Sequence, residues 1–261
     1  MTGRLALLAS AILLASCTST GGLGSPTPAG SSPSLESPSP AVSAGATRTC
    51  VSSSDGPEKL CSLEAGTTYS TEFLRPGLSY TVPSAGWGSL NREASPGNFH
   101  LFPPGGSLAG FDLGTSDDIT MLSAVVPPGT CTGKPSDKFE HTFDGLVKFL
   151  TSNKHVAIGN VRDASIGGWD GTVMDVTFAA GDGCSDGVYA DLLVGVDPSH
   201  GAFGITPAMA GARIYLLRNP TTATALAIVI DDAAGGGSDY GDKKDWYGVA
   251  QSVIDTFAFA P

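Results

Sequence analysis

The sequence predicts an α+β domain in which an antiparallel β-sheet is covered by helices. Most apolar segments after residue 64 are short runs bounded by Gly and Pro, which is typical of strands. Two later segments instead repeat their apolar residues with helical spacing. The order of hairpin, strands, helix, meander and terminal helix is that of an antiparallel sheet with helices packed on it. Residues 50–261 are long enough to bury a sizeable core.

Short apolar runs predict the strands of the first half, and one segment between them is helical. The first two strands flank Arg75-Pro76-Gly77 and are expected to form a hairpin. Apolar residues recur at i, i+3, i+4 and i+7 from Phe143, which predicts a helix near residues 142–152 with Thr142 as its N-cap. The strands expected around this helix are 67–73, 78–82, 99–102, 119–126 and 156–161.

The second half is expected to be a meander of strands that ends in an amphipathic helix. Strand 225–230 is apolar on both faces, so it should lie centrally with both sides covered. Alternation along strand 172–178 places Val173 and Asp175 on the same face. After Asp245 as N-cap, apolar residues form one continuous stripe along the last helix. The other two strands expected here are 189–196 and 212–217.

The first residues have the pattern of a lipoprotein signal peptide, which we assign to residues 1–16. The apolar run 5–15 follows one positive charge and is too short to span a bilayer as a helix. It ends in Leu14-Ala15-Ser16-Cys17, which resembles the lipobox of bacterial lipoproteins. The resemblance implies cleavage before Cys17 and attachment of diacylglycerol to its thiol. An ordinary secretory signal with a chance cysteine and a short buried helix are the alternatives.

Residues 17–49 are expected to be a disordered tether. After Cys17 this segment consists almost wholly of Ser, Thr, Pro, Gly and Ala, so it cannot bury enough apolar surface to offset its ordering entropy. The predicted organisation is therefore a signal peptide, a lipidated tether and one globular domain over residues 50–261. The predicted location is the outer face of the cell membrane, with the lipid bilayer as the partner of acylated Cys17.

Four cysteines remain for the exported domain, an even number that predicts two disulfides. They are Cys50, Cys61, Cys131 and Cys184. We favour Cys50–Cys61, which closes a short loop of turn-forming residues, together with Cys131–Cys184, and the two other pairings stay open. A zinc site is the competing interpretation, but no cysteine pair has the spacing of zinc ligands.

The charge of the chain excludes nucleic acid as a partner. Lys and Arg number 14 against 25 Asp and Glu, a formal net charge of −11. Such a chain cannot release counterions from a phosphate backbone. Anionic lipid would also repel it, so membrane attachment must be hydrophobic or covalent.

No catalytic residue and no cofactor are predicted, because no nucleophile elbow, zinc-protease motif, P-loop or dinucleotide fingerprint occurs. A serine triad would need one of four histidines, yet no Ser has the context of a nucleophile. One of the four, His100, should point away from the side of the strand 99–102 that Phe99 and Leu101 share. The four are His100, His141, His155 and His200.

Two further groups of residues are candidate binding sites. Trp87 and Trp169 lie in Gly-rich turns, where exposed indoles can form a ligand patch, although packing over the sheet edge is the more common outcome. A series of acids before the last helix could bind Ca²⁺, but its spacing matches no EF-hand, so we favour a solvated connection and predict no metal. The calcium candidates are Asp231, Asp232, Asp239 and Asp242.

Short motifs resemble the PsbP-like α/β/α fold, which actinobacterial envelope lipoproteins of the LpqN type carry. The segment 82–87, with Pro83, Gly86 and Trp87, is similar to the opening of that fold, and residues 252–259 are similar to its close. Two residues separate Pro83 from Gly86 where the pattern usually has one. The resemblance implies an α/β/α sandwich that acts as a binding or accessory module, and it supplies no catalytic residue.

The function expected from these observations is that of a membrane-anchored, non-enzymatic envelope lipoprotein whose domain binds a small ligand or another envelope protein. A lipid-anchored hydrolase that acts on cell-wall material is the alternative. The two differ in whether perturbed carboxylates or a histidine converge in one cleft.

Overall fold

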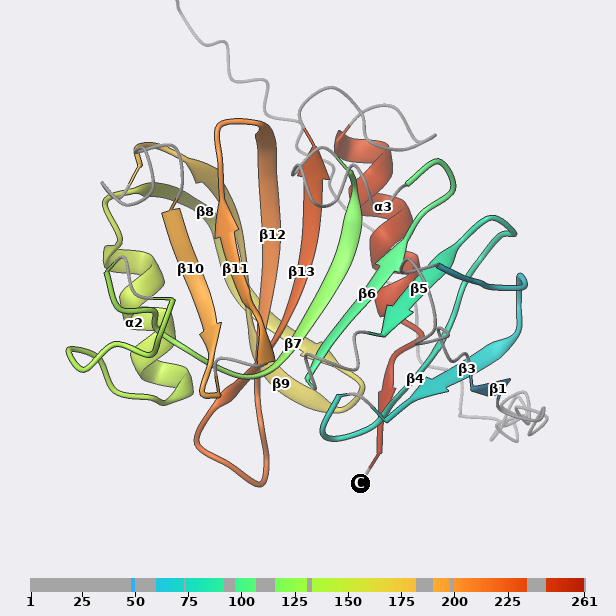
Figure 1. Ribbon diagram of the computed structural model, residues 1–261, viewed down its shortest axis with the longest axis horizontal. Coiled ribbons are helices and arrows are strands. Elements are labelled where there is room, and N and C mark those ends of the chain that lie inside the picture. The colour runs from blue at the N-terminus through green and yellow to red at the C-terminus, as the bar shows by residue number, and fades with distance from the viewer. Residues whose placement is uncertain are drawn as a thin grey trace, which may run out of the picture. The chain divides into compact units, whose positions relative to one another are not determined.

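The computed structural model describes residues 48–49, 60–72, 74–91, 97–106, 116–130, 133–181, 190–197, 200–233 and 243–260. Two helices and fourteen strands lie in these ranges (Figure 1). The helices are α2 (Phe143–Ser152) and α3 (Lys243–Ile254). The strands are β1 (Arg48–Thr49), β2 (Cys61–Ser62), β3 (Thr68–Thr71), β4 (Leu78–Thr81), β5 (Gly88–Asn91), β6 (Asn98–Phe102), β7 (Asp118–Val126), β8 (Val156–Ile166), β9 (Trp169–Phe178), β10 (Ala190–Gly195), β11 (Ala202–Ile205), β12 (Met209–Arg218), β13 (Ala225–Ala233) and β14 (Ala258–Phe259).

A large antiparallel sheet forms the centre of the domain. Its main strand order is β2-β5-β6-β7-β13-β12-β9-β8, and the β10–β11 hairpin joins it through β7. Strand β13 is buried on both faces and lies between β7 and β12, which confirms the central position predicted for 225–230. One edge of the sheet is the two-residue β2 and the other is the eleven-residue β8.

The first face of the large sheet is covered by α3 and by a small four-stranded sheet. The small sheet has the order β1-β3-β4-β14, in which β3 and β4 form the predicted hairpin and β1 runs parallel to β3. Trp87 and Trp246 pack in this layer with ring centroids 6.1 Å apart. From α3 and the residues that follow it, the buried cluster contains Trp246, Tyr247, Ala250, Val253, Ile254 and Phe257.

The second face is covered by α2 and by the β10–β11 hairpin. Phe143, Leu146 and Leu150 of α2 are buried against apolar residues of β9, β12 and β13. The hairpin adds Leu192, Leu193, Phe203 and Ile205 to the same cluster.

The prediction of a sheet covered by helices is therefore wrong, because strands dominate the described domain. Eight strands in a row span about 34 Å at ~4.8 Å per strand. One helix with its side chains is only about 10 Å wide, so a single helix on each face cannot cover them. The small sheet and the β10–β11 hairpin bury the rest of each face, and the α/β/α sandwich is replaced by a sheet-dominated fold.

Both predicted helices are present. The N-cap predicted for α2 is correct, and the one predicted for α3 is wrong. Thr142 caps α2 as predicted, since its Oγ1 accepts a hydrogen bond from the Gly145 N–H at 3.1 Å. A Cβ at Gly145 would lie 2.2 Å from the Glu140 carbonyl oxygen, so the close approach of the preceding chain requires glycine here. Asp245 is not the N-cap of the last helix, because α3 begins at Lys243 and Asp245 lies in its first turn.

The signal peptide, Cys17 and the tether up to residue 47 lie outside the described residues. Arg48–Thr49 form β1 although both residues were predicted to belong to the tether. Neither helix that the structure describes is long and apolar enough to cross a membrane. Cys61 is bonded in a disulfide, but the other three predicted disulfide cysteines are outside the described ranges, so the pairing stays a prediction.

Candidate functional site

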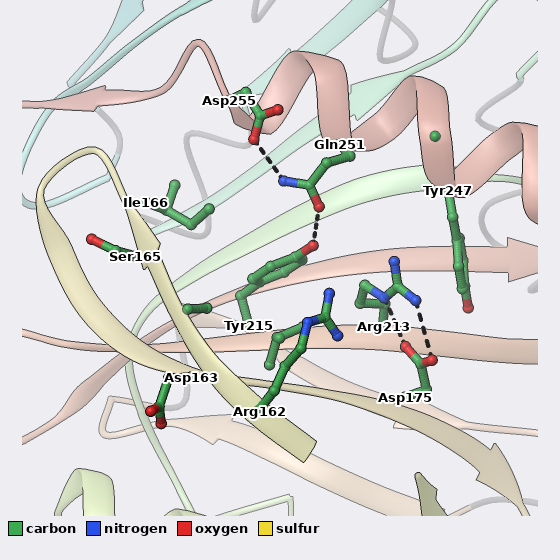
Figure 2. Close-up of a pocket in the computed structure, with 13 residues that line it drawn as sticks. Arg162, Asp163, Ser165, Ile166, Asp175, Arg213, Tyr215, Tyr247, Gln251 and Asp255 are labelled. Carbon is green, nitrogen blue, oxygen red and sulfur yellow. Dashed lines mark hydrogen bonds and ion pairs between the residues drawn. The ribbon is translucent and has the colours of Figure 1, made fainter. Parts of the chain in front are cut away.

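An open groove of about 790 Å³ lies on the first face of the large sheet, between α3 and the outer strands (Figure 2). Strands β8, β9 and β12 form its floor and α3 forms one wall. It exists because α3 packs over the centre of the sheet and leaves the outer strands uncovered on this side. We call it the α3 groove, and the residues used below are Arg162, Asp175, Arg213, Tyr215, Tyr247 and Gln251.

A partly buried ion pair lies in the floor of the α3 groove. Arg213 donates from Nε to Asp175 Oδ1 at 2.7 Å and from Nη2 to Oδ2 at 3.1 Å, and both side chains are less than a fifth exposed. Asn160 Nδ2 donates to Asp175 Oδ2 at 2.7 Å, and the Arg213 guanidinium lies 4.7 Å from the centre of the Tyr247 ring. The hydrogen bonds to Asp175 raise the pKa of Arg213 above its usual value. The hydrogen bonds from Arg213 and Asn160 hold the Asp175 carboxylate in place, so the ion pair is a rigid part of the site.

A β-bulge in β8 places Asn160 against this ion pair. Gly159 pairs with Asp175 and Arg162 with Val173, so the two residues between them oppose a single residue of β9. Asn160 adopts φ 51°, in the left-handed region that Asn tolerates better than most residues.

The α3 wall is held to the floor by a chain of hydrogen bonds. The Tyr215 hydroxyl donates to Gln251 Oε1, and Gln251 Nε2 donates to Asp255 Oδ1 at 2.7 Å (Figure 2). Burial raises the pKa of Tyr215, so its hydroxyl stays protonated at neutral pH. This chain fixes the position of α3 relative to β12.

Arg162 is the cation available to a ligand in the α3 groove. Its side chain is exposed and makes no hydrogen bond or ion pair with the residues that the structure describes. Figure 2 shows it beside Tyr215, while Asp163 points away from it. Apolar lining comes from Ile166 and Val173. Of the two exposed carboxylates in the lining, Asp163 points away from Arg162 and Asp255 accepts from Gln251. The groove therefore offers the positive charge of Arg162 beside aromatic and aliphatic surface, which suits an anionic group on an apolar body.

A polar cluster is buried in the core of the second face. His100 Nδ1 lies 3.0 Å from Asp118 Oδ2 and 2.8 Å from Thr120 Oγ1, and Thr120 donates to Asp118 Oδ2 at 2.7 Å. His100 lies on the opposite side of β6 from Phe99 and Leu101, as predicted. Each member of the cluster is at most 4% exposed, so we interpret it as a hydrogen-bonded core network rather than a reactive site.

Asp231 pairs across β13 and β7 with Asp118, and its environment makes stability depend on pH. Burial, and then the Asp118 charge, raise the pKa of Asp231 well above that of an unfolded Asp. Above pH ~4 the unfolded state ionises this carboxyl while the folded state resists ionisation, so Asp231 destabilises the fold at neutral pH. The penalty disappears as the pH falls towards the unfolded pKa.

Asp231→Asn is therefore expected to stabilise the protein at pH 7.5 and to have little effect near pH 4. The amide keeps the Oδ1 acceptor that receives the Asp232 N–H at 3.1 Å. A gain of ~1 kcal/mol would raise the Tm by about 2–4 °C in a domain of this size. Thermal melts at both pH values measure it, with the exposed Asp163→Asn as control. The same Tm difference at both pH values would contradict the titration argument.

The two tryptophans considered as a candidate binding patch lie in packed positions, the outcome that the sequence favoured. Trp87 is 1% exposed and packs against Trp246, so it offers no surface to a ligand. Trp169 is half-buried, with its ring centroid 4.7 Å from that of Phe259.

The calcium candidates and the histidines do not converge among the described residues. Asp231 and Asp232 end β13, whereas Asp239 and Asp242 lie outside the described residues. In the part of the chain that is described, no three His, Cys, Asp or Glu side chains are placed to hold a metal ion. The histidines lie in β6, before α2, before β8 and in the β10–β11 connection, and none of them lines the α3 groove.

The residues of the α3 groove were not among the sites predicted from the sequence. Arg213 and Tyr215 alternate in β12, an otherwise apolar and buried strand, and polar residues at i and i+2 of such a strand were a usable signal. Arg162 carried no comparable signal, because it lies in the mostly exposed strand β8.

The described domain is thus a sheet-dominated protein with an open groove beside its last helix. No protein-family model and no curated protein matches the chain. Among solved structures it is similar to the cyanobacterial PsbP protein, CyanoP, of Synechocystis sp. PCC 6803, with 12% sequence identity over 80% of this chain and 96% of that chain. That fold is the one the sequence motifs resemble, and the TM-score is 0.32.

Proposed function

We propose that this protein is a lipid-anchored, non-catalytic binding module on the outer face of the cell membrane, and that the α3 groove is its ligand site. The observation that carries the proposal is Arg162, a cation without a hydrogen-bonding partner among the described residues, beside aromatic and aliphatic surface in a groove of about 790 Å³. The ligand is a small molecule with an anionic group on an apolar body.

The arrangement of reactive groups favours binding over hydrolysis. The described lining of the α3 groove contains no His, Cys or Lys. Of its three carboxylates, Asp175 is occupied by Arg213 and Asn160, Asp255 accepts a hydrogen bond from Gln251, and Asp163 points away from Arg162. A lipid-anchored hydrolase of cell-wall material would need a base and a nucleophile, or two carboxylates, directed at one bond. The scattered positions of the four histidines support the binding module.

The groove is tested with 8-anilinonaphthalene-1-sulfonate, whose sulfonate and aromatic rings match its chemistry. Fluorescence titration should show saturable binding that weakens about tenfold in Arg162→Ala, because one charge-assisted contact is lost. Arg48→Ala is the control, since Arg48 is also exposed but pairs with Glu64 at 2.7 Å. If Arg162→Ala and the unaltered protein bind the probe equally, Arg162 does not form the site.

The anchor is tested separately at Cys17. Cys17→Ala is expected to leave the domain folded, abolish incorporation of labelled palmitate and move the protein out of the membrane fraction. Fractionation, metabolic labelling and a thermal melt of the same variant measure these effects. A variant that stays in the membrane fraction with unchanged labelling would contradict lipidation at Cys17.

A further inference from the structure

A second cavity, of about 390 Å³, lies at one end of the large sheet. Its lining comes from the β3–β4, β10–β11 and β12–β13 connections and from the adjoining ends of β6 and β7. Figure 1 shows the β12–β13 connection at the lower end of the sheet. The cavity shares no lining residue with the α3 groove. We call it the end pocket, and its polar residues are Arg75, Ser123, His200, Asn219, Thr222 and Thr224.

The described lining of the end pocket contains an arginine and a histidine but no acidic side chain. This is unusual for a chain with a formal net charge of −11. Arg75 is exposed and makes no hydrogen bond or ion pair with the described residues. His200 Nδ1 is buried and also has no hydrogen-bond partner there. A nitrogen in that position needs a partner, because burying a polar atom without a hydrogen bond is unfavourable.

Backbone geometry around Gly97 brings Ser123 and His200 together. A Cβ at Gly97 would lie 2.3 Å from Ser123 Oγ and 3.3 Å from the His200 ring, so both side chains close over this glycine. Gly97 has φ 93°, which other residues rarely adopt. The adjacent Ala124 has φ 52° at a bulge in β7, and such unusual conformations gather at binding sites.

The β12–β13 connection directs further donors into the end pocket. Asn219 Oδ1 accepts hydrogen bonds from the Thr221 N–H at 2.9 Å and from its hydroxyl at 2.8 Å, which orients the amide and leaves its NH₂ group for a ligand. Thr222 Oγ1 and Thr224 Oγ1 lie 2.9 Å apart. Because one hydroxyl donates to the other, one O–H of the pair remains to donate elsewhere.

We propose that the end pocket binds a phosphate monoester. The guanidinium of Arg75, the amide of Asn219 and a threonine hydroxyl donate to the phosphate oxygens, and His200 Nδ1 donates as the Nδ1–H tautomer or as imidazolium. The volume exceeds that of a bare anion and lies within the range of small-molecule pockets, so the organic part of the monoester also fits inside. The site is independent of the proposed function of the α3 groove.

The test is isothermal titration calorimetry on the full chain in detergent, with glucose 6-phosphate as probe and glucose as its uncharged match. Glucose 6-phosphate should bind saturably, and glucose should not bind. The binding of glucose 6-phosphate should be about tenfold weaker in Arg75→Ala. It should be lost in Asn219→Asp, which keeps the acceptor for Thr221 and replaces the donor with a negative charge. Arg48→Ala is the control, and thermal melts show whether each variant folds.

A second arm uses micelles that contain phosphatidic acid or, as the control, phosphatidylcholine. If phosphatidic acid binds, glucose 6-phosphate does not, and Arg75→Ala weakens the binding, the monoester is a lipid headgroup and the proposal stands. If neither phosphate probe binds, or if Arg75→Ala and Asn219→Asp bind as the unaltered chain does, the proposal is overturned.

Discussion

Gly171→Ala is expected to lower the free energy of unfolding by about 3 kcal/mol or more, one of the largest single-residue effects in the domain. Gly171 lies in β9 and pairs with Leu217 of β12. A Cβ at this position would be 1.9 Å from the Leu216 carbonyl oxygen and 2.9 Å from Leu217 Cα. Because these are backbone atoms, no rotation of a side chain relieves the overlap. The two strands must separate locally and break hydrogen bonds within the large sheet.

The matched control is Gly159→Ala in the neighbouring strand β8. An added Cβ there meets no atom within 4 Å, so the change should stay within about ±0.5 kcal/mol. Urea unfolding followed by circular dichroism measures both variants, and the difference in midpoint between them isolates the close approach of the strands. If both variants unfold at the same midpoint, β9 and β12 do not pack as closely as described.

The elements with strong local patterns were predictable from the sequence. Residues 225–230 are apolar on both faces, and β13 is buried on both sides between β7 and β12. Thr142 is followed by helical spacing, and it caps α2. In both cases burial of the element itself sets the pattern, so periodicity is enough to identify it.

The layers that cover the sheet were not predictable in the same way. β2 and β14 are two residues long, too short to show any alternation. The β10–β11 hairpin crosses the second face and pairs with β7 only at its end, through Val194 and Gly195. Helices were expected to cover the sheet because their patterns are conspicuous, whereas the covering strands are held by contacts distant in sequence.

The α3 groove was unpredictable because it depends on cross-strand register. Asp175 was expected on the same face as Val173, but its partner Arg213 is 38 residues away in sequence. Their meeting requires the alignment of β9 with β12, and Asn160 joins them only through the bulge in β8. Register and bulges are set by tertiary packing, and a single sequence shows them poorly.

Deletion of residues 245–261 is expected to abolish cooperative unfolding, the largest effect predicted for this protein. The segment contains most of α3, the buried Phe257 and strand β14, which pairs with β4. Trp246 Nε1 also donates to the Asp231 carbonyl at 2.6 Å, so the deletion removes a partner of the central strand β13. Without this layer the first face of the large sheet would be exposed to water, at a cost comparable to the total stability of a domain.

A point substitution tests the loss of core packing by α3 without deleting any residue. Ile254→Ala removes a fully buried side chain of α3 and should cost 2–5 kcal/mol, whereas Ser252→Ala on the exposed face of the same helix should cost almost nothing. Circular dichroism at 222 nm and the near-ultraviolet signal of the tryptophans that each variant retains follow the melt of all three variants. The opposing hypothesis is that the last helix is a detachable amphipathic segment that docks elsewhere. It predicts that the truncated chain melts as the intact one does, and that Ile254→Ala and Ser252→Ala have the same Tm. The contacts of Trp246, Ile254 and Phe257 in the core predict the opposite result, because each would be replaced by a cavity or by water.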